Sequence, residues 1–351
     1  MRLDGAACAQ PLVLALFRTA LELGANPYLD VTIDGLDEVL LAGGSDAQLE
    51  YISPTQWKEI ELLDALVTIW SDENTRSRTR IDPTRQSRRL AARRQLSNRR
   101  WERISEGAMR WCGTLFPTHA HAQDAEMSLA DYERFVFRAC HVEEDQGEPA
   151  AHWRSTAEEL GARARQLERV RELRILGPDT DLRVGVAGRR WIAADGRFNM
   201  PDGEVFTSPV ETETEGEIRY QFPAIFEGRE VDDVRLRFER GRVVKAEAAQ
   251  GEEYLRSLLD VDEGARVLGE VAFGLNYEID RFTSNILFDE KIGGTMHLAL
   301  GSGFPQTGTE HRSGLHWDMI CDLREEGEVY ADGELVWRAG RFLAERADGD
   351  G

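Results

Sequence analysis

Helix-like and strand-like segments alternate in the first half of the chain. Residues 10–24 place leucines at helical spacing and end at Gly24, as an amphipathic helix does. Residues 27–33, 65–70 and 110–116 are short apolar runs rich in β-forming side chains, and the stretches between them have helical patterns. This alternation predicts a parallel sheet flanked by helices.

The pattern changes after a long charged segment. Residues 148–173 have the spacing of one amphipathic helix, which we expect to end at the Gly177-Pro178 pair because proline cannot continue a helix. From residue 181 onward the chain alternates apolar and polar positions between glycine turns, which predicts strands. One such segment, residues 234–239, leads into a hairpin signal.

The length of the chain agrees with two domains. Its 351 residues exceed one ordinary domain of about 100–200 residues. We predict an α/β domain at residues 1–177 and a mostly-β catalytic domain at residues 178–351. With 41% hydrophobic and 30% charged residues, the composition is that of a globular protein and argues against a largely disordered chain.

The net charge of the chain restricts the classes of molecule that it is expected to bind. Asp and Glu number 64 against 43 Lys and Arg, a net charge of −21, which disfavours nucleic-acid binding. Residues 76–110 nevertheless hold twelve arginines, with Trp101 as their only aromatic residue. These arginines form either a solvated helical face or a group of guanidinium ions that faces a cleft and steers a carboxylate.

Cysteine content and hydropathy point to the cytoplasm. The four cysteines include no close pair, so neither a disulfide framework nor a zinc knuckle is indicated. The apolar run near the start is followed by Glu22 and favours an internal helix over a signal peptide. No stretch approaches the ~20 apolar residues of a membrane span, so we expect no membrane partner. The acidic tail at residues 347–351 is expected to fray.

Two residues in the last third of the chain have the spacing of metal ligands. His316 and Asp318 lie in residues 315–320, which read as a strand, and residues two apart in a strand point to the same side. An imidazole and a carboxylate side by side suit a divalent metal ion. The alternative is an ordinary polar face of a half-exposed strand.

Three further residues are candidates on similar grounds. His297 follows a Gly-Gly turn within an apolar stretch, where it is either a ligand or a hydrogen-bonded core histidine. Glu270 lies in an apolar strand between two glycines, and burying it there requires a cation. Glu204 follows a Pro-Asp-Gly turn and can equally be a turn residue. Together these five residues match a carboxylate-bridged site for two metal ions: Glu204, Glu270, His297, His316 and Asp318.

Three long motifs resemble those of the thermophilic metallo-aminopeptidase family. They are NMPDGEVFTSPVETETEG, FDEKIGGTMHLALGSGFPQTG and SGLHWDMICDLREEGEVYADGELVWRAGRF, and a looser likeness extends from Pro11 to the end of the chain. The resemblance implies a homodimer whose subunit has an α/β N-terminal domain and a β-barrel-like catalytic domain of α+β type. Carried over by motif, the ligands of the family's two divalent ions fall on the same five residues.

The resemblance also implies a reaction. Members of the family remove N-terminal amino acids from short peptides with zinc, cobalt or similar ions, of which manganese and magnesium are further options. A metal-activated hydroxide would attack the first peptide carbonyl. Glu270 is our candidate for the general base, although the same carboxylate can instead be purely a ligand.

The chain departs from the family at two places. The family's tyrosine near the metals corresponds to Phe304, so His311, Arg312 or a metal ion would have to stabilise the oxyanion in its place. The segment before Pro11 is shorter than in relatives, which means either a miscalled start or an N-terminal sheet lacking an element, with exposed apolar surface. Two other hypotheses stay open: an inactive relative serving as a peptide-binding or structural subunit, and a hydrolase of a different amide.

Overall fold

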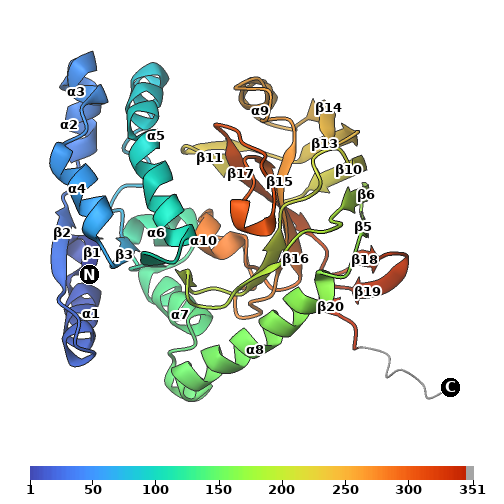
Figure 1. Ribbon diagram of the computed structural model, residues 1–351, viewed down its shortest axis with the longest axis horizontal. Coiled ribbons are helices and arrows are strands. Elements are labelled where there is room, and N and C mark those ends of the chain that lie inside the picture. The colour runs from blue at the N-terminus through green and yellow to red at the C-terminus, as the bar shows by residue number, and fades with distance from the viewer. Residues whose placement is uncertain (345–351) are drawn as a thin grey trace. The chain divides into compact units, whose positions relative to one another are not determined.

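The computed structural model describes residues 1–344, which form two compact units (Figure 1). The first unit comprises Met1–Val136 and Arg197–Met200, and the second comprises the rest of the described chain. The division falls before helix α8 (Pro149–Leu167), whereas the sequence places a boundary after residue 177. The physical reason is that α8 buries apolar side chains in the core of the second unit: Leu160, Ala164 and Leu167. The tail at residues 347–351 lies outside the described residues.

A parallel sheet forms the centre of the first unit, as predicted. Its strand order is β2-β1-β3-β4-β8. The strands are β1 (Arg2–Ala6), β2 (Tyr28–Thr32), β3 (Ala65–Trp70), β4 (Arg110–Leu115) and β8 (Asn199–Met200). Three of them lie where the sequence pattern places strands. No element was predicted for β1, whose buried Leu3 is flanked by the ion-paired Arg2 and Asp4.

Helices follow the strands of the first unit. The predicted helix at residues 10–24 is α1 (Gln10–Glu22), which begins with proline in its first turn. The other helices are α2 (Leu36–Gly43), α3 (Asp46–Glu50), α4 (Pro54–Leu62), α5 (Pro83–Ser105), α6 (His119–Asp124) and α7 (Leu129–Ala139), the last of which continues into the second unit at Phe137.

The arginines of α5 bind the ends of three other helices. Arg85 donates to the carbonyls of Leu41 and Gly44 at the end of α2, and Arg89 donates to those of Leu49 and Tyr51 at the end of α3. The last carbonyls of a helix lack partners within it, and a cation there also suits the helix dipole.

Arg103 binds α4 in the same way. Its guanidinium donates to the carbonyls of Ile60, Leu63 and Ala108, and the residue is only 9% exposed. Three of the twelve arginines in residues 76–110 therefore form a structural brace within the first unit. Neither interpretation from sequence, a solvated face or a cleft that steers anions, describes these three arginines.

Two antiparallel sheets build most of the second unit. The larger has the order β14-β13-β10-β6-β5-β18-β19-β20 and the smaller β17-β16-β15-β9-β7. Its larger sheet consists of β5 (Glu172–Gly177), β6 (Thr180–Gly185), β10 (Thr214–Tyr220), β13 (Val234–Glu239), β14 (Arg242–Glu247), β18 (Glu328–Ala331), β19 (Glu334–Arg338) and β20 (Arg341–Phe342). The predicted hairpin is the β13–β14 pair.

One expectation for this part of the chain is wrong. The segment predicted as a single helix over residues 148–173 divides into α8 and strand β5. Leu173 and Ile175 of β5 are fully buried at alternating positions, but arginines and glutamates around them give the segment the appearance of a charged helix.

The smaller sheet places the five candidate ligand residues on adjacent strands. Its strands are β7 (Ile192–Ala194), β9 (Glu204–Thr207), β15 (Leu268–Gly274), β16 (Thr295–Gly301) and β17 (His316–Asp322). Every residue of β15 and β16 is buried, so any polar side chain on them requires a partner. Shorter elements complete the unit: β11 (Ala224–Phe226), β12 (Arg229–Val231), α9 (Glu252–Leu259) and α10 (Ile286–Asp289).

Apolar side chains of both sheets pack into one core, which includes Phe273, Trp317 and Trp337. Among residues 1–344, no helix is long and apolar enough to cross a membrane.

Candidate metal centre

The five candidate ligands lie on four neighbouring strands of the smaller sheet. Glu204 opens β9, Glu270 lies on β15, His297 on β16, and His316 and Asp318 on β17. The structure therefore brings together residues that are up to 114 positions apart in sequence, 318 − 204.

Strand register places all five side chains on one face of this sheet. Ala299 of β16 pairs with Glu270 on one side and Asp318 on the other, while Gly301 pairs with His316. His297 lies two residues from Ala299 and hence on the same face, and Glu204 joins that face from β9. Because Ala299 and Gly301 are small, the larger side chains beside them have room to converge.

A glycine sets the direction of the chain entering β9. Gly203 has φ +125°, and a Cβ atom there would lie 2.9 Å from Cβ of Asn276. The side-chain amide of Asn276 donates to the carbonyl of Asp202, 2.9 Å away, and to that of Ala139, 3.0 Å away. This contact fixes the turn immediately before Glu204.

Glu270 links two halves of the centre. Its Oε1 lies 3.6 Å from Nε2 of His297, and its Oε2 lies 3.4 Å from Nε2 of His316. On one side, Nε2 of His297 is also 3.4 Å from Oε2 of Glu204. On the other, Nε2 of His316 is 3.5 Å from Oδ1 of Asp318. A carboxylate placed between two imidazoles in this way suits a ligand shared by two ions.

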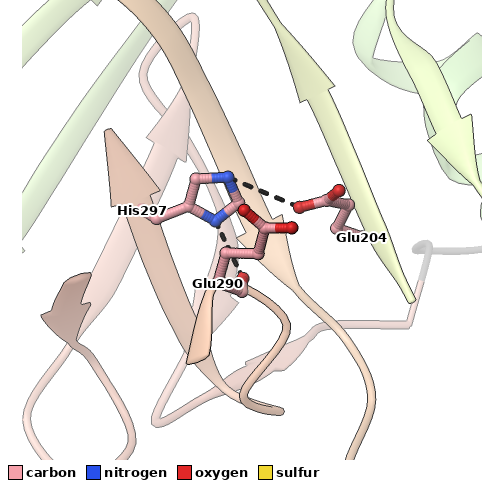
Figure 2. A group of neighbouring side chains, drawn as sticks. All are labelled: Glu204, Glu290 and His297. Atoms are coloured by element: carbon pink, nitrogen blue, oxygen red, sulfur yellow. Dashed lines mark hydrogen bonds and ion pairs between the residues drawn. The ribbon is translucent and has the colours of Figure 1, made fainter. Parts of the chain in front are cut away.

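Sequence reasoning missed a sixth residue of the centre, Glu290. It follows α10 and lies beside His297 and Glu204 (Figure 2). Ligand atoms within 4.8 Å of one another form two groups, Glu204/Glu290/His297 and Glu270/His316/Asp318. The only sequence signal for Glu290 is the charged run Asp-Glu-Lys between the apolar residues Phe288 and Ile292. Charged residues flanked in this way are expected to be buried rather than solvated.

Both histidines are held in the tautomer that metal binding requires. Nδ1 of His297 donates to the carbonyl of Glu290 at 2.8 Å (Figure 2), and Nδ1 of His316 donates to the carbonyl of Ser302 at 2.8 Å. A carbonyl can only accept, so the Nδ1 protons are fixed there. The Nε2 atoms, which face the carboxylates, are left to bind an ion.

Burial and charge perturb the acids and bases of the centre. Burial alone would lower the pKa of His297, but Glu270 and Glu204 outweigh it and raise that pKa to about 10. Burial would raise the pKa of Asp318, yet His316 and His297 lower it to about 2. Burial also raises the pKa of Glu204 well above its usual value. The centre therefore binds positive charge strongly, whether from protons or from metal ions.

Two buried oxygens show that a metal ion fits these residues. Oε2 of Glu204 and Oδ1 of Asp318 are buried, and within the described chain they accept no hydrogen bond that meets normal geometry: their nearest partners are Nε2 of His297 at 3.4 Å and Nε2 of His316 at 3.5 Å. An unsatisfied buried carboxylate oxygen is costly. A divalent ion in each group would satisfy these atoms with the oxygen and nitrogen ligands that zinc and similar metals accept.

The exposed part of the centre is bordered by an apolar ring. The side chain of His316 is 33% exposed, against 5% for that of Glu270. The ring of Phe304 lies edge-on to His316 with centroids 5.1 Å apart, so no hydroxyl is present at this position. The side chains expected to compensate bind backbone instead: Nε2 of His311 donates to the carbonyl of Gly264, and Arg312 donates to that of His311.

Comparisons with known proteins agree with this fold. The model of the thermophilic metalloprotease family M29 matches residues 3–342. Aminopeptidase T of Thermus thermophilus is 31% identical over 262 residues, which cover 66% of this chain and 63% of that protein. Aminopeptidase 2 of Geobacillus stearothermophilus is 31% identical over 279 residues, covering 68% and 66%. The match thus spans slightly less than two thirds of the length of these curated relatives.

Two solved structures share the fold. Wild-type AmpT from Thermus thermophilus has a TM-score of 0.85 and 27% identity, with 98% of this chain and 94% of that chain covered. The 2,5-dihydroxypyridine dioxygenase of Pseudomonas putida KT2440 has a TM-score of 0.63, covering 98% and 91%, but only 16% identity. The second likeness concerns the fold alone.

Proposed function

The chain belongs to the M29 family of thermophilic metalloproteases, and from this premise we propose that it is a metal-dependent aminopeptidase acting on the N-terminal bond of short peptides. The observation that supports this most is the shared position of Glu270 between His297 and His316. It gives the centre two adjoining groups of ligands, as a two-ion hydrolase needs.

Each proposed ion has its own set of ligands. The first would be held by Glu204, Glu290 and His297, the second by His316 and Asp318, and Glu270 would serve both. The ions would be zinc or cobalt, with manganese or magnesium as further options. When bound, they supply Lewis acidity that polarises a peptide carbonyl and makes water acidic near neutral pH.

The side chains of the protein prepare this chemistry. The Nδ1 hydrogen bonds of His297 and His316 orient both rings before an ion arrives, which reduces the cost of ordering them. Since both oxygens of Glu270 face imidazoles, we propose the ligand role for it over the general-base role. Phe304 presents an apolar edge beside His316, which limits water there and provides no proton donor.

Metal removal and one substitution test the proposed function. Chelator-treated protein should hydrolyse neither leucine nor arginine p-nitroanilide, and Co²⁺ or Zn²⁺ should restore the activity. Glu270→Gln should lower kcat/KM by about 100-fold or more, because even outer partners of metal ligands are worth 10- to 100-fold. The exposed strand residue Glu247 provides the control Glu247→Gln, which should leave activity unchanged. Activity that is insensitive to chelation, or absent with every metal, would refute the proposal.

Phe304 supports a second candidate function, a weakened or inactive relative that binds peptides. If the tyrosine implied by the family resemblance stabilises the oxyanion, Phe304→Tyr should raise kcat by about 10- to 100-fold with little change in KM. The same change at the exposed Phe137, a residue of α7, serves as control. An active wild-type protein that gains nothing from Phe304→Tyr would exclude this candidate and leave the choice of amide substrate to peptide and acyl-amide assays.

We also propose a homodimer in the cytoplasm. Strand β2 is the edge of its sheet, and all five of its residues are exposed. Leu29 and Val31 on this strand, with Ile33 just after it, form an apolar edge that a second subunit would cover.

A further inference from the structure

Two aromatic side chains border the metal centre on one side. Phe206 and Phe304 are partly exposed, and their rings form a T-shaped pair with centroids 5.2 Å apart. The ring of Phe304 also meets that of His316 edge-on. Neither phenyl ring is among the side chains that pack into the apolar core around Phe273 and Trp317. A partly exposed aromatic pair beside a polar site is suited to binding an apolar group.

Strand register places Phe206 beside the Glu204/Glu290/His297 group. Glu204 and Phe206 are two residues apart on β9 and share a face, whereas Val205 between them is fully buried in the core. Ala272 of β15 pairs with Phe206 on one side and with His297 on the other. Because the residue between them is a small alanine, the ring of Phe206 stands at the border of this group.

Hydrogen bonds hold Phe304 next to Phe206. The backbone N–H of Phe304 donates to Oγ of the buried Ser208, 3.0 Å away, and Ser208 lies two residues after Phe206. The hydroxyl of Thr307 donates to the carbonyl of Phe304 at 2.6 Å. A Cβ atom at Gly303 would lie 2.8 Å from Oγ of Ser208, so glycine allows this close approach. Because these bonds use the backbone of Phe304, its ring is not needed to hold the loop.

We infer that Phe206 and Phe304 bind the side chain of a peptide's first residue, so that the enzyme favours large apolar N-terminal residues. The inference rests on the proposed aminopeptidase function. In that reaction the first peptide bond must lie at the centre, and the two rings border both groups of ligands there. The charged α-amine of the substrate favours the carboxylates, which leaves the rings to the side chain.

The surroundings of the rings favour the first residue over the second. An aminopeptidase has a single residue on the amino side of the cleaved bond, so its binding site can end at a wall. The rest of the peptide requires an open path. Phe206 is backed by protein, because Ile192 of β7 pairs with it on the side away from Ala272. The most exposed ligand for which a side-chain value is given above, His316, lies on β17 at the other edge of the sheet.

The size of the effect follows from burial. A difference of one methylene group in an apolar pocket changes kcat/KM by about 10-fold or more. Leucine is larger than alanine by an isopropyl group, so it should be favoured at least about tenfold. An acidic first residue should be disfavoured, because the carboxylates of the centre repel it.

Two dipeptides with the same residues in opposite order test the inference. With the Co²⁺-loaded full chain, kcat/KM should be at least about tenfold higher for Leu-Ala than for Ala-Leu. Phe206→Ala and Phe304→Ala should each lower this ratio at least about fivefold. The control Phe137→Ala removes an exposed ring on α7 and should leave the ratio unchanged. A wild-type ratio near one, or a reversed ratio, would overturn the inference.

Binding without turnover separates this inference from the proposed function. The hydroxamates of leucine and alanine chelate divalent metal ions through their oxygen atoms. In calorimetry, the leucine compound should bind the Co²⁺-loaded wild type at least about tenfold more tightly, and Phe206→Ala should reduce that difference. If that variant does not fold, Phe304→Ala provides the same comparison.

The two readouts have distinct outcomes. A difference in hydroxamate affinity without cleavage of any dipeptide would refute the aminopeptidase function and retain the apolar site. Cleavage with equal kcat/KM for both dipeptides and equal hydroxamate affinities would overturn the inference alone. Absence of both cleavage and hydroxamate binding would refute the two together.

Discussion

At the scale of single residues, hydrogen bonds and ion pairs hold the side chains of the centre in fixed orientations. His297 cannot rotate its Nε2 away from Glu204 and Glu270 without losing the bond from Nδ1 to the carbonyl of Glu290. Glu270 cannot be replaced without affecting both groups of ligands. The geometry is therefore prepared by ordinary hydrogen bonds and strand register, before any ion is present.

The raised pKa of His297 predicts how the stability of the metal-free protein depends on pH. The imidazole has its ordinary pKa of 6.5 when unfolded and about 10 when folded, so the folded chain holds an extra proton between these values. This contribution is complete below pH 6.5 and is lost as the pH rises toward 10. Stability should fall by up to about 1.4 kcal/mol per pH unit across that range.

Thermal unfolding with chelator and with Co²⁺ measures this effect. The melting temperature of the metal-free protein should fall steadily from pH 6.5 to 10. Since an ion takes the place of the protons, the increase caused by Co²⁺ should grow over the same range. A matched variant, His297→Asn, should reduce the slope of the curve measured with chelator, and the remaining slope would come from His316, whose pKa Asp318 and Glu270 raise against the effect of burial. An increase that is independent of pH would contradict the protonation of this group.

At the scale of elements, α5 stabilises its neighbours through one buried arginine in particular. Arg103→Met removes the donors to the carbonyls of Ile60 and Leu63 at the end of α4. The free energy of unfolding of the first unit should fall by about 2–4 kcal/mol, because the buried carbonyls lose their partners.

A neighbouring arginine is the matched control. Arg99→Met lies one turn earlier on α5 and removes the exposed pairs with Glu61 and Glu102, which contribute little. Thermal unfolding followed by tryptophan fluorescence should show a clearly larger drop for Arg103→Met. Equal drops in the two variants would show that the helix ends do not depend on Arg103.

Some elements could be predicted from the sequence because their own order of apolar and polar residues shows which side chains are buried. Strand β3 covers the predicted residues 65–70, since its apolar run has turn residues after it. Strand β5 could not be predicted because only Leu173 and Ile175 indicate a buried strand, and charged residues surround them. Glu290 was missed for another reason: it lies beside Glu204 and His297 only in the folded chain, just after α10, and no local spacing reveals that contact.

At the scale of the whole molecule, the apolar edge on β2 predicts self-association. Light scattering should give the mass of a dimer for the wild type. Val31→Lys places a charge on that edge, where the side chain is 46% exposed, and should raise the dissociation constant at least tenfold.

The second unit offers a control at matched exposure. Val244 on β14 is 49% exposed, and Val244→Lys should leave the dimer intact. A wild-type monomer, or equal behaviour of the two variants, would remove β2 from the interface.

The brace formed by α5 has a consequence for the order in which the first unit opens. Arg85, Arg89 and Arg103 hold the C-terminal ends of α2, α3 and α4 from a single helix, so we expect these ends to stay formed while α5 stays in place. Their backbone amides should consequently exchange with solvent deuterium at a common rate, as one foldon. Helices α2, α3, α4 and α5 should therefore unfold as a single unit.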